Sequence, residues 1–344
     1  MRHLPHLLRA RGYRTGQFVV PHYAASTDFN LLGGFDVMNR RAGGSGVITT
    51  RLLVALGPGG YLLQQIWQRV RTRIEALAGQ GEYSSFEQIT EPRAAQYMDT
   101  IRLRQLAAFL TGHREPWLAH VHLLVTHGPR FAVRRQHFSV GQAQVRDWMT
   151  DFYDDAIVEA DESVGQIVQL LRVHGTFDRT LIIVYSDHPQ SRRTIRAVPL
   201  LVRVPGAARD GRIGQTVQTV DIAPTVLDAL GIAPPNWMTG QSLLVPVRPC
   251  RRVFGAIAAD RVQLWGHGDY YTVPTPPYFS LGAVSLIIGK QWFVLSLDSS
   301  TRALSGGAIA VSEGAPTTCN PLTPPQARAA IIDHLRTRGY DLSH

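Results

Sequence analysis

The sequence predicts an α/β fold in which a mainly parallel sheet lies between helices. Three segments predict this class. Leu181 to Val184 is a short run of branched apolar residues, typical of a strand covered on both faces. An amphipathic helix is expected before it at Tyr153 to His174, and a second apolar strand after it at Val198 to Val204. Helices that alternate with such strands are characteristic of parallel sheets.

The helix expected at Tyr153 to His174 has an apolar stripe and an opposite polar side. Its carboxylates, including Asp155 and Glu159, are expected on the solvent side. The apolar stripe consists of Ile157, Ala160, Val164, Ile167, Val168 and Leu171. Gly175 follows as a C-terminal stop.

Downstream, Thr219 to Ile232 is expected to form a helix with Asp221 as its N-cap. Shorter strands follow, and a last helix is expected from Pro324. We therefore expect an α/β domain over residues 1–248 and a smaller carboxyl-terminal sheet-plus-helix subdomain over residues 249–344.

Two candidate metal ligands follow the strand at Leu181 to Val184. Asp187 and His188 come just after it, and in open α/β sheets ligands bind beyond the carboxyl ends of the strands. A carboxylate oxygen and an imidazole nitrogen can both coordinate a divalent cation. A loop aspartate beside a surface histidine is the alternative interpretation.

The order of these segments resembles the sulfatase family of the alkaline phosphatase superfamily. A helix leads to a strand ending in Ser186-Asp187-His188, then to a strand ending in Pro205-Gly206 and a Val-Asp-x-x-Pro-Thr helix. Gly240 to Leu244 resembles the Gly-x-Ser-Leu that follows in the family. This resemblance implies an alkaline-phosphatase-like fold.

Segments nearer the amino terminus extend the likeness. Trp117 to Phe131 resembles the family's strand ending in a His-Gly-Pro-aromatic turn. Leu4 to Val19 resembles the helix and strand after the nucleophile segment, and Gly34-Phe35-Asp36 resembles the family's Gly-Phe-Asp. The likeness therefore covers about residues 4–36 and 96–245.

The resemblance implies a metal-dependent hydrolase of sulfate monoesters. It implies a divalent cation, Ca²⁺ first and Zn²⁺ or Mn²⁺ in phosphotransferring relatives, held in part by Asp187 and His188. It also implies that His127 contacts the anionic ester substrate. The family's loop lysine has no counterpart here, so Arg192 or Arg193 is the nearby cation that could bind the substrate.

The departures from the family concern its nucleophile. The family's first strand, with its paired aspartates, and its Cys/Ser-x-Pro-x-Arg turn are expected before Leu4, where this sequence reads Met1-Arg2-His3. Neither Cys250 nor Cys319 lies in such a turn. We therefore expect an incomplete sulfatase-like domain that lacks its first strand and its catalytic nucleophile. A phosphoryl-group transferase or hydrolase of the same superfamily and a catalytically dead binding or scaffold protein are the alternatives.

Three histidines offer a competing metal site. His120 and His122 lie on one face of their expected strand, and with His127 they could bind zinc. The alternative is that His120 and His122 are core histidines, each with one hydrogen bond.

Composition excludes other classes of function. The net charge is +9, but Lys290 is the only lysine among 35 basic residues, which indicates genomic arginine bias more than an anion-binding surface. There is no nucleic-acid-binding motif. No stretch reaches the ~18–20 apolar residues of a membrane span. A cytoplasmic location is the default expectation, and a membrane or periplasmic one applies if an upstream segment exists.

Overall fold

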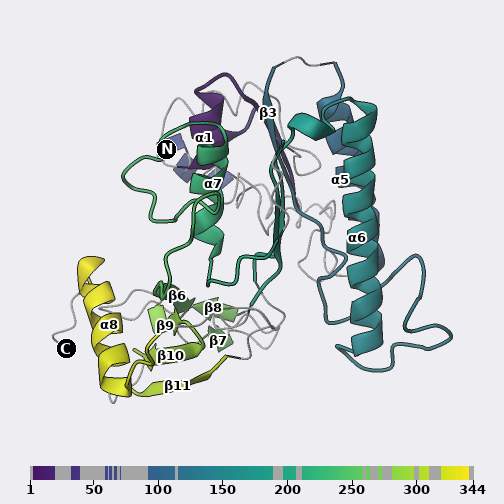
Figure 1. Ribbon diagram of the computed structural model, residues 1–344. Helices are drawn as coiled ribbons and strands as arrows, with labels where there is room; N and C mark the ends of the chain where they lie inside the picture. Colours follow the sequence, from purple (N-terminus) through teal and green to yellow (C-terminus); the bar gives the residue numbers. More distant parts are fainter. Residues whose placement is uncertain are drawn as a thin grey trace. The chain divides into compact units, whose positions relative to one another are not determined.

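The computed structural model describes two compact units, Met1–Asp178 and Arg179–His344 (Figure 1). The described residues are 3–19, 32–38, isolated helical positions between 59 and 70, 92–112, 115–188, 197–206, 211–258, 261–263, 270–272, 281–297, 302–309 and 319–340. The unit boundary at 178/179 lies within the expected first domain, and the domain boundary expected at 248/249 stays a prediction.

The first unit contains a three-stranded parallel sheet in the order β2-β1-β3. Its elements are α1 (Leu4–Arg9), β1 (Arg14–Phe18), η1 (Leu32–Gly34), β2 (Val37–Met38), α5 (Pro92–Leu110), β3 (Trp117–Val121) and α6 (Thr150–Val173). The short helix η2 (Phe177–Arg179) spans the boundary between the units. Helices α1 and α5 lie on opposite sides of the sheet (Figure 1). The expected parallel sheet between helices is thus present in this unit.

Helix α5 packs on one face of β1 through Phe109. The Phe109 ring contacts Phe18 and Trp117 edge to face, with centroids 5.5 Å and 6.5 Å apart. A Cβ on Gly16 would lie 3.0 Å from the Phe109 ring, so a larger residue there would have to displace that ring. The Arg14 guanidinium lies 4.7 Å above the same ring. Alternate residues of β1 therefore form the face that α5 covers.

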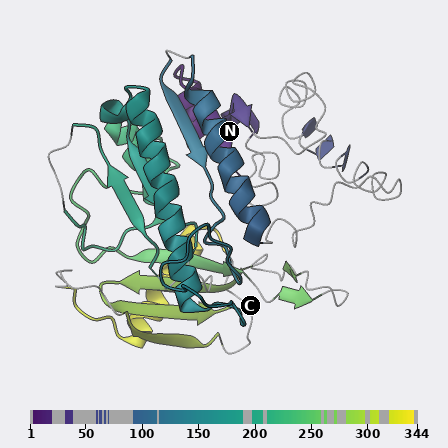
Figure 2. The same ribbon diagram turned by 90° about the vertical axis from the view of Figure 1, so that its right-hand side faces the viewer.

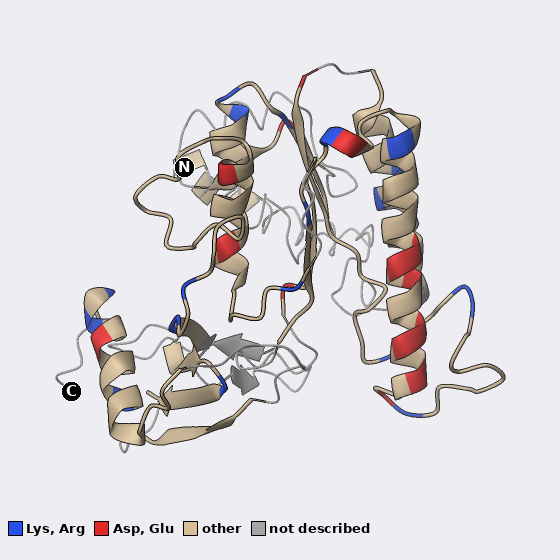
Figure 3. Cartoon of the chain, viewed as in Figure 1, with Lys and Arg blue, Asp and Glu red and all other residues tan. Residues whose placement is uncertain are grey.

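Helix α6 lies beside α5, and acidic residues gather in its amino-terminal half (Figures 2 and 3). The expectation that Asp155 and Glu159 face solvent is wrong, because they are 0% and 5% exposed. Ile157, expected in the apolar stripe, is 45% exposed. The two carboxylates are buried because they accept hydrogen bonds from the loop over residues 134–139.

The second unit begins with β4 (Ile182–Tyr185) and β5 (Leu200–Arg203), which pair antiparallel. The expectation of a parallel strand covered on both faces is wrong for β4 within the described residues, where β5 is its one partner and Tyr185 is exposed. The expectation failed because a run of branched apolar residues predicts a strand without determining its partner or the direction of pairing.

The rest of the second unit contains the expected smaller sheet with a helix packed on it, and also the helix α7 and the strand pair β7-β8. Its sheet is antiparallel in the order β11-β10-β9-β6, and α8 packs on it through Ile331 and Leu335. The elements are η3 (Thr219–Asp221), α7 (Ile222–Ala229), β6 (Val253–Ala258), β7 (Arg261–Gln263), β8 (Tyr270–Thr272), β9 (Leu281–Ile288), β10 (Gln291–Ser296), β11 (Leu304–Ala308) and α8 (Pro324–Thr337). A disulfide joins Cys250 to Cys319. Among the described residues, no helix is long and apolar enough to cross a membrane.

Candidate functional site

Asp187 and His188 lie together just beyond the end of β4. The Nε2 atom of His188 is 3.5 Å from Oδ2 of Asp187. The backbone N–H of His188 donates to Oδ1 of Asp187 at 2.8 Å, and the Ser186 hydroxyl donates to the His188 carbonyl at 2.8 Å. The side chains are 63% and 39% exposed, so both can be reached by an ion from solvent.

The negative charge of Asp187 affects the pKa of Tyr185, the last residue of β4. Partial burial raises the pKa of the Tyr185 phenol, whose residue is 40% exposed, and the negative charge of Asp187 raises it further. The same negative charge of Asp187 attracts a cation to this end of β4.

Asp187 and His188 fit a divalent cation as part of a ligand set. A calcium site takes about six to eight oxygen ligands and a zinc site about four ligands. In the part of the chain that the structure describes, no three His, Cys, Asp or Glu residues are grouped closely enough to hold a metal ion. The pair supplies two donors of suitable chemistry, and a complete site needs further ligands.

His127 lies in the first unit, in the turn that follows β3. Its backbone N–H donates to the Leu124 carbonyl at 2.7 Å. A Cβ on Gly128 would come within 2.3 Å of the Trp148 ring, so only glycine fits the next position. Asp187 belongs to the other unit, so the convergence of His127 with Asp187 and His188 stays a prediction.

The remaining predictions concern the two substrate-binding arginines and the alternative zinc site. Arg192 and Arg193 lie outside the described residues, so their role stays a prediction. The zinc site is not formed, because His120, His122 and His127 are described and make no metal-binding group.

His120 is a core histidine instead. Its Nδ1 lies 3.4 Å from Nε2 of Gln17 on the neighbouring strand. Burial lowers the pKa of His120, so its imidazole is neutral at pH 7.

Sequence reasoning missed a buried ion pair behind the His127 turn. Asp99 and Arg102 on α5 are 5% and 1% exposed, and Nη1 of Arg102 donates to Oδ1 of Asp99 at 3.0 Å. The Asp99 carboxylate also accepts the backbone N–H groups of Leu124 and Val125. Asp99 lies on the buried face of α5. A charged residue on the apolar face of a helix could have predicted a buried ion pair, because charged residues are almost never fully buried unless they are paired.

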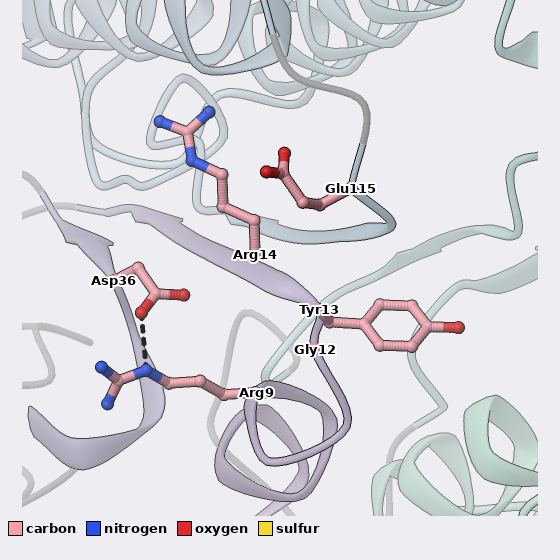
Figure 4. A pocket seen from close by; sticks show the side chains of 6 residues that line it. All are labelled: Arg9, Gly12, Tyr13, Arg14, Asp36 and Glu115. Carbon is pink, nitrogen blue, oxygen red and sulfur yellow. Dashed lines mark hydrogen bonds and ion pairs between the residues drawn. The ribbon is translucent and has the colours of Figure 1, made fainter.

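An open pocket of about 450 Å³ lies at the amino-terminal end of β1, where Arg9, Arg14, Asp36 and Glu115 meet (Figure 4). The Arg9 Nε donates to Oδ1 of Asp36 at 2.6 Å, and the Arg14 Nη1 donates to the Phe109 carbonyl at 3.1 Å. Both arginines are thus engaged within the protein. Asp36, the last residue of the Gly-Phe-Asp motif, accepts hydrogen bonds from the backbone N–H and the hydroxyl of Thr15 on β1. We therefore interpret the residues of this pocket as structural.

The Gly-Gln-Ser-Leu-Leu segment also has a structural role. Asp221 was expected to cap α7, but its side chain makes no capping bond to that helix. It instead accepts the backbone N–H groups of Gln218 and Gln241 at 2.9 Å and 2.8 Å. A Cβ on Gly240 would lie 2.1 Å from the Val220 carbonyl oxygen. The segment therefore packs against the start of α7 at a distance that only glycine permits.

The family model Sulfatase matches residues 1–232, and the chain belongs to the sulfatase family. It is 34% identical over 105 residues to arylsulfatase K of Bos taurus, covering 27% of this chain and 19% of that protein. It is 32% identical over 114 residues to an ulvan-active sulfatase of Formosa agariphila, covering 30% and 19%. The matched stretch thus spans about a fifth of the length of these curated relatives.

Solved structures show the same fold. The phosphonate monoester hydrolase from Silicibacter pomeroyi superimposes with a TM-score of 0.56 at 15% identity, over 99% of this chain and 80% of that one. Ps i-CgsB in complex with k-i-k-neocarrahexaose gives 0.55 at 14% identity, over 98% and 73%. The fold is therefore the alkaline-phosphatase-like α/β fold. Its superfamily generally uses divalent metals, and sulfatases act on anionic sulfate esters.

Proposed function

We propose that this chain is part of a sulfuric ester hydrolase in which Asp187 and His188 bind a divalent cation. One observation carries the proposal: a carboxylate oxygen and an imidazole nitrogen lie 3.5 Å apart, exposed, just beyond the end of β4. Membership of the sulfatase family supports a sulfate monoester as substrate.

In this proposal, two side chains bind the cation and the others contact the substrate. A cation bound here would neutralise charge on the non-bridging oxygens of the ester. Asp187 supplies an anionic oxygen ligand, and His188 a neutral nitrogen. His127 donates a hydrogen bond to an ester oxygen, and Arg192 or Arg193 adds positive charge beside the substrate.

The covalent step is not assigned to these residues. Cys250 and Cys319, the two cysteines of the chain, are joined in a disulfide and offer no thiol. No Cys/Ser-x-Pro-x-Arg turn occurs within these 344 residues. Asp187, His188, His127 and Arg192 or Arg193 are therefore proposed for binding the cation and the substrate only.

We propose Ca²⁺ as the cation, as the family resemblance implies. One observation favours the related alternative of phosphoryl-group transfer or hydrolysis. The chain is 24% identical over 163 residues to the lipoteichoic acid synthase of Staphylococcus saprophyticus, covering 41% of this chain and 25% of that protein. Zn²⁺ or Mn²⁺ would be the expected ion for that chemistry.

Cation-dependent binding of an aryl sulfate tests the proposal. Calorimetry of the 344-residue chain with saturating Ca²⁺ is expected to show binding that is lost on chelation and in Asp187→Ala. Asp161→Ala is the matched control, because Asp161 is an exposed carboxylate on α6. Stronger binding of an aryl phosphate, with Zn²⁺ or Mn²⁺, would favour the alternative. Binding that is unchanged in Asp187→Ala would contradict both.

A further inference from the structure

We propose that Asp99 and Arg102 form a buried positioning unit that fixes the turn carrying His127. The inference rests on the proposed role of His127 as a substrate contact. It adds two residues of α5 that lie behind the turn and do not touch the substrate themselves.

The carboxylate of Asp99 accepts backbone N–H groups just beyond the end of β3, where the hydrogen bonds between strands stop. His122 still donates its backbone N–H to the Phe18 carbonyl of β1 at 2.9 Å. Two residues later, the N–H of Leu124 donates to both Asp99 oxygens at 2.9 Å and 2.8 Å, and the N–H of Val125 donates to Oδ2 at 2.8 Å. Asp99 thus supplies the acceptors that a neighbouring strand would otherwise supply.

The residues held by Asp99 lead directly to the histidine. The carbonyl of Leu124 accepts the backbone N–H of His127 at 2.7 Å, which closes the turn. Gly128 then lies against the Trp148 ring, too close for any Cβ. The His127 turn is therefore tied by Asp99 on its entry side and by Trp148 on its exit side.

Stability alone does not account for an ion pair at this place. Burying two charges costs desolvation free energy that their attraction often fails to recover. Arg102 donates through Nη1 to Asp99, whereas its Nε and Nη2 have no hydrogen-bond partner among the described residues. Among the described residues, the Arg102 side chain therefore donates hydrogen bonds to Asp99 and to no other group.

The role of Arg102 follows from the charge state of Asp99. Burial raises the pKa of Asp99 to about 6, while the N–H groups of Leu124 and Val125 and the charge of Arg102 lower it. Arg102 is the one charged group among the described residues that acts on this pKa. Without Arg102 the carboxyl would take up a proton nearer neutral pH and lose acceptor strength toward both amides.

Hydrogen exchange of the turn tests the proposal with no substrate or metal present, so its outcome is independent of the proposed activity. In Asp99→Asn, protection of the amides at 124–127 is expected to fall about tenfold or more. Asp155→Asn is the matched control, since Asp155 is a buried carboxylate that accepts the backbone N–H groups of His137, Phe138 and Ser139. It should lower protection at 137–139 and leave 124–127 unchanged.

Two further readouts separate positioning from general stabilisation. In Arg102→Met, protection at 124–127 is expected to be lower than in the wild type at pH 7 and to rise with increasing pH, as Asp99 ionises again. The imidazole NMR titration of His127 should shift in Asp99→Asn and stay unchanged in Asp155→Asn. Equal loss of protection across the whole unit in Asp99→Asn, without pH-dependent recovery in Arg102→Met, would overturn the proposal. An unchanged His127 titration in Asp99→Asn would overturn it as well.

Discussion

Arg251 and Asp221 form a buried bidentate ion pair, with Nη1 to Oδ2 at 2.6 Å and Nη2 to Oδ1 at 2.7 Å. Their side chains are 8% and 0% exposed. Because the same carboxylate accepts the backbone N–H groups of Gln218 and Gln241, the pair joins three segments. These are the start of α7, the Gly-Gln-Ser-Leu-Leu segment and the entry to β6.

Arg251→Met is expected to destabilise the protein by about 3–5 kcal/mol, because it leaves the Asp221 carboxylate buried without its counterion. Urea unfolding followed by circular dichroism measures the free energy of unfolding. Arg130→Met is the matched control. Arg130 pairs with Asp147 on the surface, with side chains 48% and 56% exposed, so its loss should cost less than about 1 kcal/mol. Equal effects of the two substitutions would contradict the prediction.

Gly240→Ala is expected to lower the free energy of unfolding by more than about 1 kcal/mol, since the added Cβ would meet the Val220 carbonyl oxygen. Gly165→Ala offers a contrast in sign. Gly165 lies inside α6 with no atom within 4 Å of the added Cβ, so alanine there should stabilise by about 0.5–1 kcal/mol. Thermal unfolding of both variants checks the pair, and a neutral Gly240→Ala would show that the segment can move away from α7.

The sequence was sufficient for the features that local pattern determines. The helix ending before Gly175 and the helix from Pro324 follow from periodicity and caps. The strands of the parallel sheet in the first unit, β1 and β3, follow from the motif order of the family resemblance. The direction of β4 did not, because an apolar run does not reveal its partner.

The expectation that Asp155 and Glu159 face solvent fails for a different reason. Asp155 and Glu159 lie on the polar side of α6, and helical periodicity assigns that side to solvent. Their partners include backbone N–H groups of the loop over residues 134–139, and backbone N–H groups carry no sequence signal. Asp221 was read as a cap because its partner Arg251 lies 30 residues further along the chain. Long-range partners of charged groups are therefore what local sequence patterns could not supply.

The pH dependence of stability should report Asp99. Its pKa is raised from 3.8 to about 6, so between about pH 4 and 6 the folded protein holds a proton that the unfolded chain has released. The free energy of unfolding should therefore fall as pH rises through this window, by about 2–3 kcal/mol. Asp99→Asn should remove this part of the slope. Parallel stability curves for the two proteins between pH 4 and 7 would contradict the prediction.

Asp155 should show the opposite sign. Burial raises the pKa of Asp155, but hydrogen bonds from the Ser139 hydroxyl and the backbone N–H groups of Phe138, His137 and Ser139 outweigh it and lower the pKa below 3.8. Its contribution to stability is present above about pH 4 and is lost as pH falls through the folded-state pKa. Acid unfolding of Asp155→Asn should accordingly be less steep than that of the wild type below pH 4.

The 344-residue chain by itself is expected not to hydrolyse aryl sulfates or aryl phosphates, even with added Ca²⁺, Mn²⁺ or Zn²⁺. Both cysteines are in a disulfide, so neither supplies a thiol nucleophile, and the sequence contains no Cys/Ser-x-Pro-x-Arg turn. Product release by the purified chain, compared with Asp187→Ala, is the measurement. Turnover that disappears in the variant would show that these residues assemble a complete site.

Metal contact at His188 tests the central claim, that Asp187 and His188 are ligands of one cation. In the ¹⁵N-histidine spectrum of the folded chain, substoichiometric Mn²⁺ should broaden the His188 imidazole signal first. Asp187→Ala should abolish this broadening at the same Mn²⁺ concentration, while the exposed-carboxylate control Asp161→Ala should preserve it. Broadening at His188 that survives in Asp187→Ala, or strongest broadening at another histidine, would contradict the claim.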